Sequence, residues 1–134
     1  MNISPTNSEE TSSGVILLVE DDRPIRLFLQ TVLQRAGYQV IAAADGLEAL
    51  KVVMSQPVAA VITDAVMPHL SGHELCRFLR RHPQLSSLPL IMLSGLSDDK
   101  LRAEFVEKPD IYLTKPVSGK DLVDSLTRLL GQTV

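Results

Sequence analysis

The sequence is poor in several features that would point to particular classes of protein. It contains one cysteine, Cys76, which excludes an intrachain disulfide and is compatible with a reducing compartment such as the cytoplasm. No apolar run approaches the roughly 20 residues that a membrane-spanning helix needs. The net charge of −3 offers no positive surplus that would favour nucleic acid or an anionic membrane.

The N-terminal segment, residues 1–13, is polar and lacks the basic start and apolar centre of a signal peptide. We expect a disordered polar tail there. The remaining residues, 14–131, are expected to form a single domain, because a chain of 134 residues suits one domain with a substantial core.

Five short apolar runs alternate with five stretches whose apolar residues recur at helical spacing. Continuous apolar runs of this length are typical of strands buried on both faces of a parallel sheet. We expect strands over residues 15–19, 39–43, 58–63, 89–93 and 111–114. We expect helices over residues 24–36, 47–54 and 73–81, after a cap at 97–99, and after Ser118. This alternation predicts an α/β fold with helices on both faces of a five-stranded parallel sheet.

Helical spacing also predicts which side chains face the core. In the first helix, Ile25 and Phe28 fall on the same stripe as Leu29 and Leu33. In the fourth helix the packing residues are expected to be Leu101, Phe105 and Val106. The three histidines, His69, His73 and His82, are expected to have surface or capping roles.

Polar side chains follow four of the expected strands, at their carboxyl ends. They are Glu20 and Asp21, with Asp22 next, then Asp64, Ser94 and Lys115. Parallel strands share a carboxyl edge, and in open α/β sheets that edge is where ligands bind. Carboxylates brought together there would repel unless a cation neutralises them, and Mg²⁺ prefers such oxygen ligands.

The chemistry of this set suits phosphoryl transfer. Asp64 is a candidate nucleophile that would form an aspartyl phosphate, and Lys115 and Ser94 could bind the phosphoryl oxygens. Phosphoryl transfer needs mainly positioning and charge compensation. Each residue alone also has an ordinary interpretation: a turn or helix cap for the acids and for Ser94, and a surface charge for Lys115. Their joint occurrence at four strand ends favours a site.

These residues lie in stretches that resemble the receiver domain of two-component response regulators. The stretches are Ile16-Leu17-Leu18-Val19-Glu20-Asp21-Asp22, Thr63-Asp64-Ala65-Val66-Met67-Pro68 with Ser71-Gly72, Leu93-Ser94-Gly95, and Tyr112-Leu113-Thr114-Lys115-Pro116. The resemblance spans about residues 15 to 130. It implies a flavodoxin-like (βα)5 doubly wound fold with strand order 2-1-3-4-5.

The resemblance also implies a role for each site residue. Asp64 would be the phosphoacceptor, while Ser94 and Lys115 would hold the phosphoryl group. Mg²⁺ would be bound by Glu20, Asp21, Asp64 and the backbone carbonyl of Val66. Tyr112 would move together with Ser94 as a switch, and the bond before Pro116 would be cis.

Partners follow from the same resemblance. The phosphoryl donor would be a histidine kinase or a histidine phosphotransfer protein, and the output partner stays unknown. The surface of the fourth helix, fifth strand and fifth helix would change its affinity for partners, in a monomer or a weak dimer, without direct contact to nucleic acid or membrane. The protein would not be an enzyme beyond Mg²⁺-dependent self-phosphorylation and slow autodephosphorylation, which Val66 and Leu96 would influence.

Three departures from the family pattern concern the last third of the chain. Lys108-Pro109-Asp110 stands where the family often has Gly-Ala-Asp, and Val117 replaces an aromatic residue. The segment from Ser94 to Lys115 is also slightly short, so the region of the fourth helix departs most from the family pattern.

Three alternatives share parts of this pattern. A flavin-binding carrier needs a phosphate-cradling loop after the first strand, where this chain has three acids. A phosphatase with an aspartate nucleophile would have a second acid where Val66 stands. A non-phosphorylatable pseudo-receiver would lack part of the acid, hydroxyl and lysine set.

Overall fold

The structure is a computed structural model that describes residues 14–131, and the side chain of Leu96 lies outside the description. The expected tail, residues 1–13, also lies outside the described residues. Along the chain the elements are β1 (Val15–Val19), α2 (Arg23–Arg35), β2 (Gln39–Ala43), α3 (Gly46–Ser55), β3 (Ala60–Asp64), α4 (Gly72–Arg81), β4 (Leu90–Ser94), the 3-10 helix η1 (Leu96–Asp98), α5 (Asp99–Ala103), β5 (Ile111–Thr114) and α6 (Gly119–Leu129). The expected alternation of strands and helices is therefore confirmed.

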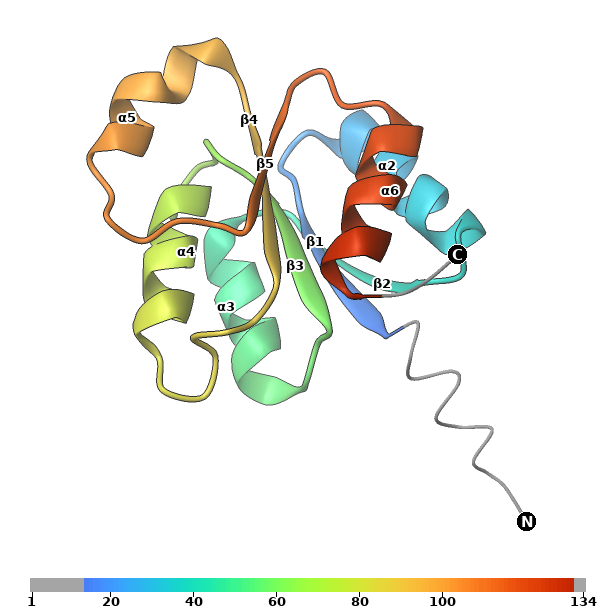
Figure 1. The fold of residues 1–134 in the computed structure, drawn as a ribbon, viewed down its shortest axis with the longest axis horizontal. Helices are drawn as coiled ribbons and strands as arrows, with labels where there is room; N and C mark the ends of the chain where they lie inside the picture. Colours follow the sequence, from blue (N-terminus) through green and yellow to red (C-terminus); the bar gives the residue numbers. More distant parts are fainter. Residues whose placement is uncertain (1–13, 132–134) are drawn as a thin grey trace.

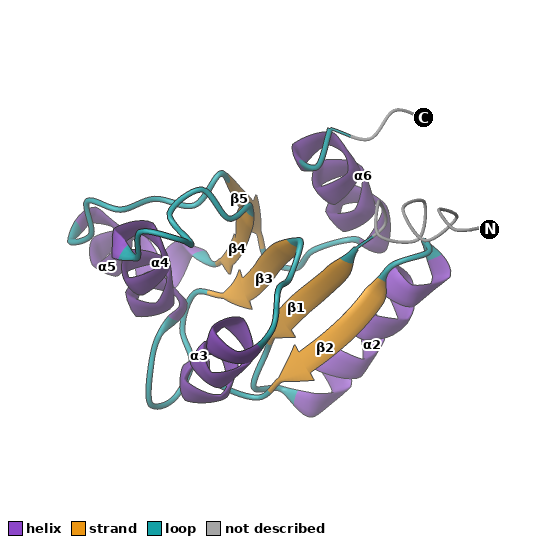
Figure 2. Cartoon of the chain, turned by 90° about the horizontal axis from the view of Figure 1, so that it is seen from below, coloured by secondary structure: helices purple, strands orange, loops and turns teal. Residues whose placement is uncertain are grey.

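The strands form one parallel sheet in the order β2-β1-β3-β4-β5, as the flavodoxin-like fold requires. Helices α2 and α6 cover one face and α3 and α4 the other, with α5 beside α4 (Figures 1 and 2). Alternate residues of β1 serve the two faces: Leu17 and Val19 pack with α3 and α4, and Ile16 and Leu18 with α2 and α6. The central strands β1, β3 and β4 are thus buried on both sides.

Local signals set the ends of several helices, and the expected cap at Ser118 is confirmed. Asp22, Asp45, Ser71 and Ser118 each accept a backbone N–H as N-caps, and Ser71 forms a full capping box with Glu74. After α2, Gly37 has φ +100°, a conformation that favours glycine at this position. Among the described helices, none is both long and apolar enough to cross a bilayer.

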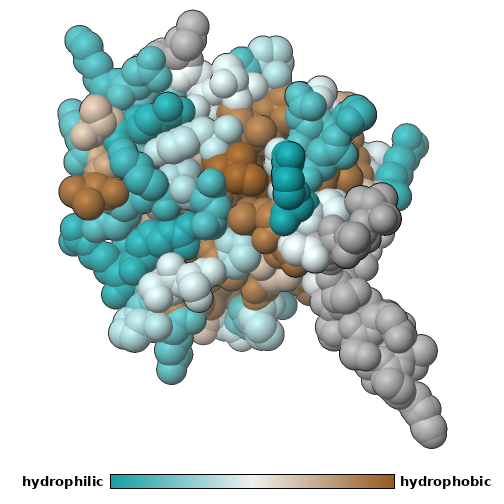
Figure 3. Space-filling model, in the orientation of Figure 1, coloured by the Kyte–Doolittle hydropathy of each residue, from teal (hydrophilic) through white to brown (hydrophobic). Residues whose placement is uncertain are grey.

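The structure corrects two expectations about the core. Ile25 and Phe28 are 40% and 53% exposed, because they line a hollow beside the loop after β5 while Leu29 and Leu33 face the sheet. Val106 is 85% exposed, because α5 ends at Ala103 and the following loop returns the chain to β5. The view of Figure 3 shows apolar surface beside largely polar surface on one side of the molecule.

Candidate functional site

Three carboxylates meet at the carboxyl edge of the sheet. Asp64 is the last residue of β3, whose neighbours are β1 and β4, and Glu20 and Asp21 directly follow β1. Each of the three offers one oxygen, and these oxygens lie within 4.8 Å of one another. The parallel register predicts this, because Val19 pairs with Thr63 and so brings the two strand ends level.

Lys115 supplies the positive charge of the site. Its Nζ lies 2.9 Å from Asp64 Oδ1, which also accepts the N–H of Ala65 at 3.0 Å. Both contacts use Oδ1 and leave Oδ2 to other partners. The Lys115 N–H donates to the Ser94 carbonyl at 2.9 Å, and the Lys115–Pro116 bond is cis. The lysine is therefore held from the backbone as well as by its charge.

The electrostatics of the site favour an additional cation. Glu20 is 1% exposed, and burial raises its pKa to about 7, with Asp64 adding to the rise. Burial likewise raises the pKa of Asp64, although Lys115 opposes this. Burial alone would lower the pKa of Lys115, but its bond with Asp64 outweighs burial and raises that pKa.

One ammonium faces three carboxylates in this cluster. Glu20 Oε1 is buried without a hydrogen-bond partner among the described residues, whereas Oε2 accepts the N–H of Asp22 at 3.0 Å. An unpaired buried carboxylate oxygen is costly unless a cation approaches it. This donor set of hard oxygens with excess negative charge fits Mg²⁺.

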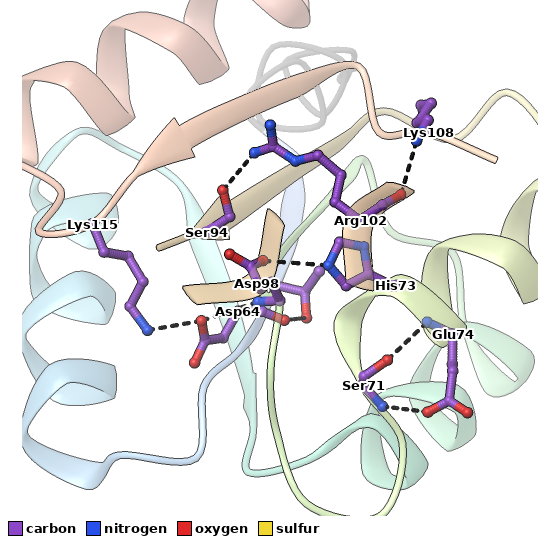
Figure 4. Close-up of polar contacts among 11 residues, drawn as sticks. Asp64, Ser71, His73, Glu74, Ser94, Asp98, Arg102, Lys108 and Lys115 are labelled. Atoms are coloured by element: carbon purple, nitrogen blue, oxygen red, sulfur yellow. Dashed lines mark hydrogen bonds and ion pairs between the residues drawn. The ribbon is translucent and has the colours of Figure 1, made fainter. Parts of the chain in front are cut away.

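Ser94 and Tyr112 are brought together by a residue that the sequence did not single out. Arg102 Nη2 donates to Ser94 Oγ at 2.8 Å, and its guanidinium lies 3.7 Å from the centre of the Tyr112 ring. In Figure 4 the Ser94 hydroxyl points toward Arg102, whereas the Asp64 carboxylate points toward Lys115. A lone arginine in a short helix carries no sequence signal for this contact.

A second buried pair lies beside the site. His73 in α4 is 2% exposed, so its expected surface or capping role is wrong. Its Nε2 lies 3.3 Å from Asp98 Oδ2, and its ring stacks on Phe105 with centroids 5.4 Å apart. The Asp98 side chain makes no N-cap hydrogen bond to α5. Its carboxylate pairs with His73 instead and so connects η1 to α4.

Comparisons with known proteins agree with this geometry. The family model described as "Response regulator receiver domain" matches residues 16–127. The transcriptional regulatory protein GltR of Pseudomonas aeruginosa is 38% identical over 116 residues, which are 86% of this chain and 48% of that protein. The chain spans about half the length of the first curated relatives it matches, 48% and 51% of them.

Solved structures show the same similarity. The receiver domain of a signal transduction histidine kinase from Syntrophus aciditrophicus has a TM-score of 0.82 at 33% identity, covering 88% of this chain and 90% of that one. The receiver domain of the sensor histidine kinase PA1611 from Pseudomonas aeruginosa has a TM-score of 0.80 at 29% identity, covering 89% and 98%. That second structure has a magnesium ion coordinated in its active site cleft.

Proposed function

Because this chain belongs to the response regulator receiver domain family of two-component signal transduction, we propose that Asp64 accepts a phosphoryl group from a phosphohistidine. The donor is a histidine kinase or a histidine phosphotransfer protein. The observation that carries this proposal is the position of Asp64. It is buried at the sheet edge, 2.9 Å from the Lys115 ammonium and within a three-carboxylate cluster.

The reaction uses Asp64 as the nucleophile. One of its carboxylate oxygens forms a bond to phosphorus while the bond from phosphorus to the donor imidazole nitrogen breaks, and that nitrogen keeps the electron pair. Lys115 binds the phosphoryl oxygens, and the Ala65 N–H supports the Asp64 carboxylate. The Ser94 hydroxyl donates a hydrogen bond to the transferred phosphoryl group once the Ser94 side chain has turned toward Asp64.

The acids of the site provide the metal ligands. Glu20, Asp21 and Asp64, with the backbone carbonyl of Val66, would hold Mg²⁺, which when bound supplies the charge that offsets carboxylates and phosphoryl oxygens. The raised pKa of Glu20 keeps part of its population neutral near pH 7 until the cation is bound. Val66 would contribute only its backbone carbonyl, because a valine side chain has no oxygen or nitrogen to offer a metal.

An apolar hollow next to the site suits docking of the donor. It has a volume of about 460 Å³ and combines Ile25 and Phe28 of α2 with Pro116 and Val117 after β5. Glu20 and Lys115 also line it, so a donor helix seated there would lie beside Asp64. Exposed aromatic and aliphatic side chains favour a protein partner.

The output passes through the surface of α5, β5 and α6, which corresponds to the fourth helix, fifth strand and fifth helix of the sequence. Phosphorylation shifts an existing equilibrium by giving Ser94 and Lys115 a new ligand, and Tyr112 moves with Ser94.

We place this receiver, residues 14–131, in the cytoplasm as a monomer or weak dimer. It makes no direct contact with nucleic acid or membrane and catalyses nothing beyond its own phosphorylation and slow dephosphorylation.

The test is incubation with acetyl phosphate and Mg²⁺, followed by mass spectrometry. The wild-type chain should gain one phosphoryl group, and Asp64→Asn should gain none. Asp99→Asn is the matched control, because it removes an exposed acid at the start of α5, away from the cluster. Its phosphorylation should equal that of the wild type.

Three outcomes would contradict the proposal. A stable Mg²⁺-dependent adduct that persists in Asp64→Asn would place the acceptor elsewhere. Failure of the wild type to gain phosphate from small donors and from phosphorylated kinases would indicate a pseudo-receiver. Continuous turnover of an aryl phosphate would instead indicate a phosphatase.

A further inference from the structure

Arg102 in α5 connects the two residues to which the proposed switch is assigned. Its Nη2 donates to Ser94 Oγ at 2.8 Å, and its guanidinium lies over the Tyr112 ring at 3.7 Å. Ser94 is 3% exposed, so this contact takes place away from solvent. The charged hydrogen bond to Ser94 and the cation–π contact with Tyr112 therefore couple the positions of these two residues to that of Arg102.

The hydrogen bond constrains the direction of the Ser94 side chain. Arginine donates only, so Ser94 Oγ must act as the acceptor. Figure 4 shows this oxygen turned toward Arg102, while the Asp64 carboxylate is turned toward Lys115. The Ser94 hydroxyl keeps its own proton to donate, so the two partners compete through its direction: a Ser94 side chain that turns toward a phosphoryl group on Asp64 gives up its bond to Arg102.

The backbone of Arg102 is tied down as well. Its carbonyl accepts Lys108 Nζ at 3.0 Å and the N–H of Phe105 at 3.2 Å. The Arg102 Nε, in contrast, is buried without a hydrogen-bond partner among the described residues. The guanidinium is thus positioned by Ser94 and Tyr112. Its buried, unpaired Nε costs free energy, so this position is only moderately favoured.

We propose that Arg102 is a latch for the unphosphorylated state, a positioning residue that holds Ser94 away from the phosphoryl site and holds Tyr112 under its guanidinium. This inference rests on the proposed function of Asp64. Phosphorylation and the latch compete for the Ser94 hydroxyl, so each weakens the other by the same factor. Substitution of Arg102 should therefore raise the affinity of the site for a phosphoryl group. If Arg102 instead bound the phosphoryl group, its substitution would lower that affinity.

The experiment measures binding of beryllofluoride with Mg²⁺, a non-covalent mimic of the phosphoryl group, by calorimetry on the full chain. Arg102→Ala should bind about 3- to 10-fold more tightly than the wild type, because one charged hydrogen bond and one cation–π contact no longer oppose binding. Arg102→Lys keeps the charge and should show a smaller increase. Lys100→Ala is the matched control, because it removes an exposed cation from the same helix and should leave affinity unchanged.

A double-mutant cycle separates a latch from a general loosening of α5. In a Ser94→Ala background, Arg102→Ala should no longer raise the affinity, because the hydroxyl for which both groups compete is gone. Amide NMR spectra of Arg102→Ala without ligand should shift at Ser94 and Tyr112 toward their positions in the bound wild type. The same spectra show whether each variant is folded, and Arg102→Lys replaces any variant that is not.

The outcomes distinguish this inference from the proposed function. If the wild type does not bind beryllofluoride with Mg²⁺, the proposed function fails. If the wild type binds and Arg102→Ala binds equally well, the latch alone is wrong. Weaker binding by Arg102→Ala would overturn the latch in the opposite sense and make Arg102 a ligand of the phosphoryl group.

Discussion

Gly72 shows how closely the backbone packs around the phosphoacceptor. Its N–H donates to the carbonyl of Ala65 at 2.8 Å, which folds the start of α4 back over the end of β3. A Cβ at this position would lie 2.1 Å from the carbonyl oxygen of Asp64 and 3.0 Å from the Cα of Ala65. Both of these neighbours are backbone atoms and cannot move aside without moving Asp64.

We expect Gly72→Ala to lower the free energy of unfolding by more than about 2 kcal/mol, because overpacking against backbone shifts the strand end. The same substitution should reduce phosphate uptake at Asp64. Urea denaturation and mass spectrometry after acetyl phosphate would measure the two effects. Gly95→Ala is the control, since a Cβ there approaches only Ser97 Oγ, at 4.0 Å. Equal stability of the two variants would contradict this account of Gly72.

At the scale of elements, the segment from η1 to β5 depends on contacts from α4. Helix α5 has five residues, no buried residue and no side-chain N-cap bond, so its own sequence stabilises it little. His73 of α4 pairs with Asp98, and Arg80 of α4 binds the loop that follows α5. The α5 surface to which the output is assigned is therefore positioned by a neighbouring helix.

Arg80 makes several of these contacts at once. Its Nε donates to the carbonyl of Lys108 at 3.1 Å, its Nη1 to that of Leu88 at 2.7 Å, and its Nη2 to Asp110 Oδ2 at 2.9 Å. Asp110 Oδ2 also accepts the N–H of Leu90 at the start of β4. A planar fork of donors can join three segments in this way, and a lysine ammonium cannot.

We expect Arg80→Ala to lower the free energy of unfolding by about 1–3 kcal/mol, because it removes the donor of the partly buried Leu88 carbonyl and breaks the links to Lys108 and Asp110. Hydrogen exchange should accelerate over residues 104–110. Arg81→Ala is the matched control: Arg81 is 66% exposed and makes one ion pair with Glu107, so its loss should cost less. The interpretation fails if exchange in this loop is unchanged in Arg80→Ala.

At the scale of the molecule, the fold concentrates negative charge where its central strands end. The sheet is apolar on both faces, and at the edge with Glu20, Asp21 and Asp64 the ammonium of Lys115 pairs with Asp64. The folded chain therefore holds Glu20 in an environment that disfavours its ionised form. In the metal-free protein these acids lower the free energy of unfolding, although the same acids are the candidate metal ligands.

The pH dependence of stability follows from the sign of this shift. The pKa of Glu20 is about 7 in the folded chain against an ordinary value of 4.5, so the folded state retains a proton that the unfolded state releases. This contribution to stability is fully present below the lower pKa and is lost as pH rises through about 7. In the metal-free protein the loss should be of the order of 3 kcal/mol, since each unit of pKa difference corresponds to about 1.4 kcal/mol.

Chemical denaturation of metal-free protein at several pH values would measure the effect. Glu20→Gln should flatten the profile between the two pKa values, because the amide does not titrate. Saturating Mg²⁺ should restore stability at about pH 8 in the wild type, since a ligand that binds only the folded state stabilises it. An unchanged slope in Glu20→Gln would show that another group causes the loss.

Much of the fold could be predicted from neighbours along the chain. The apolar runs of β1, β3 and β4 and the capping residues Ser71 and Ser118 act over a few residues, so their effects are visible in the sequence. The cluster of Glu20, Asp21 and Asp64 was also foreseeable, because parallel strands place their carboxyl ends along one edge.

Apart from the residues gathered at this shared edge, contacts between side chains of different elements could not be foreseen. His73 meets Asp98 across 25 positions, and Arg102 reaches Ser94 and Tyr112 only because a short α5 turns its side chain back over β4 and β5. The exposure of Phe28 and Val106 likewise depends on what lies opposite them. Periodicity shows which residues share a face, but burial and pairing depend on which other element covers that face and at what distance.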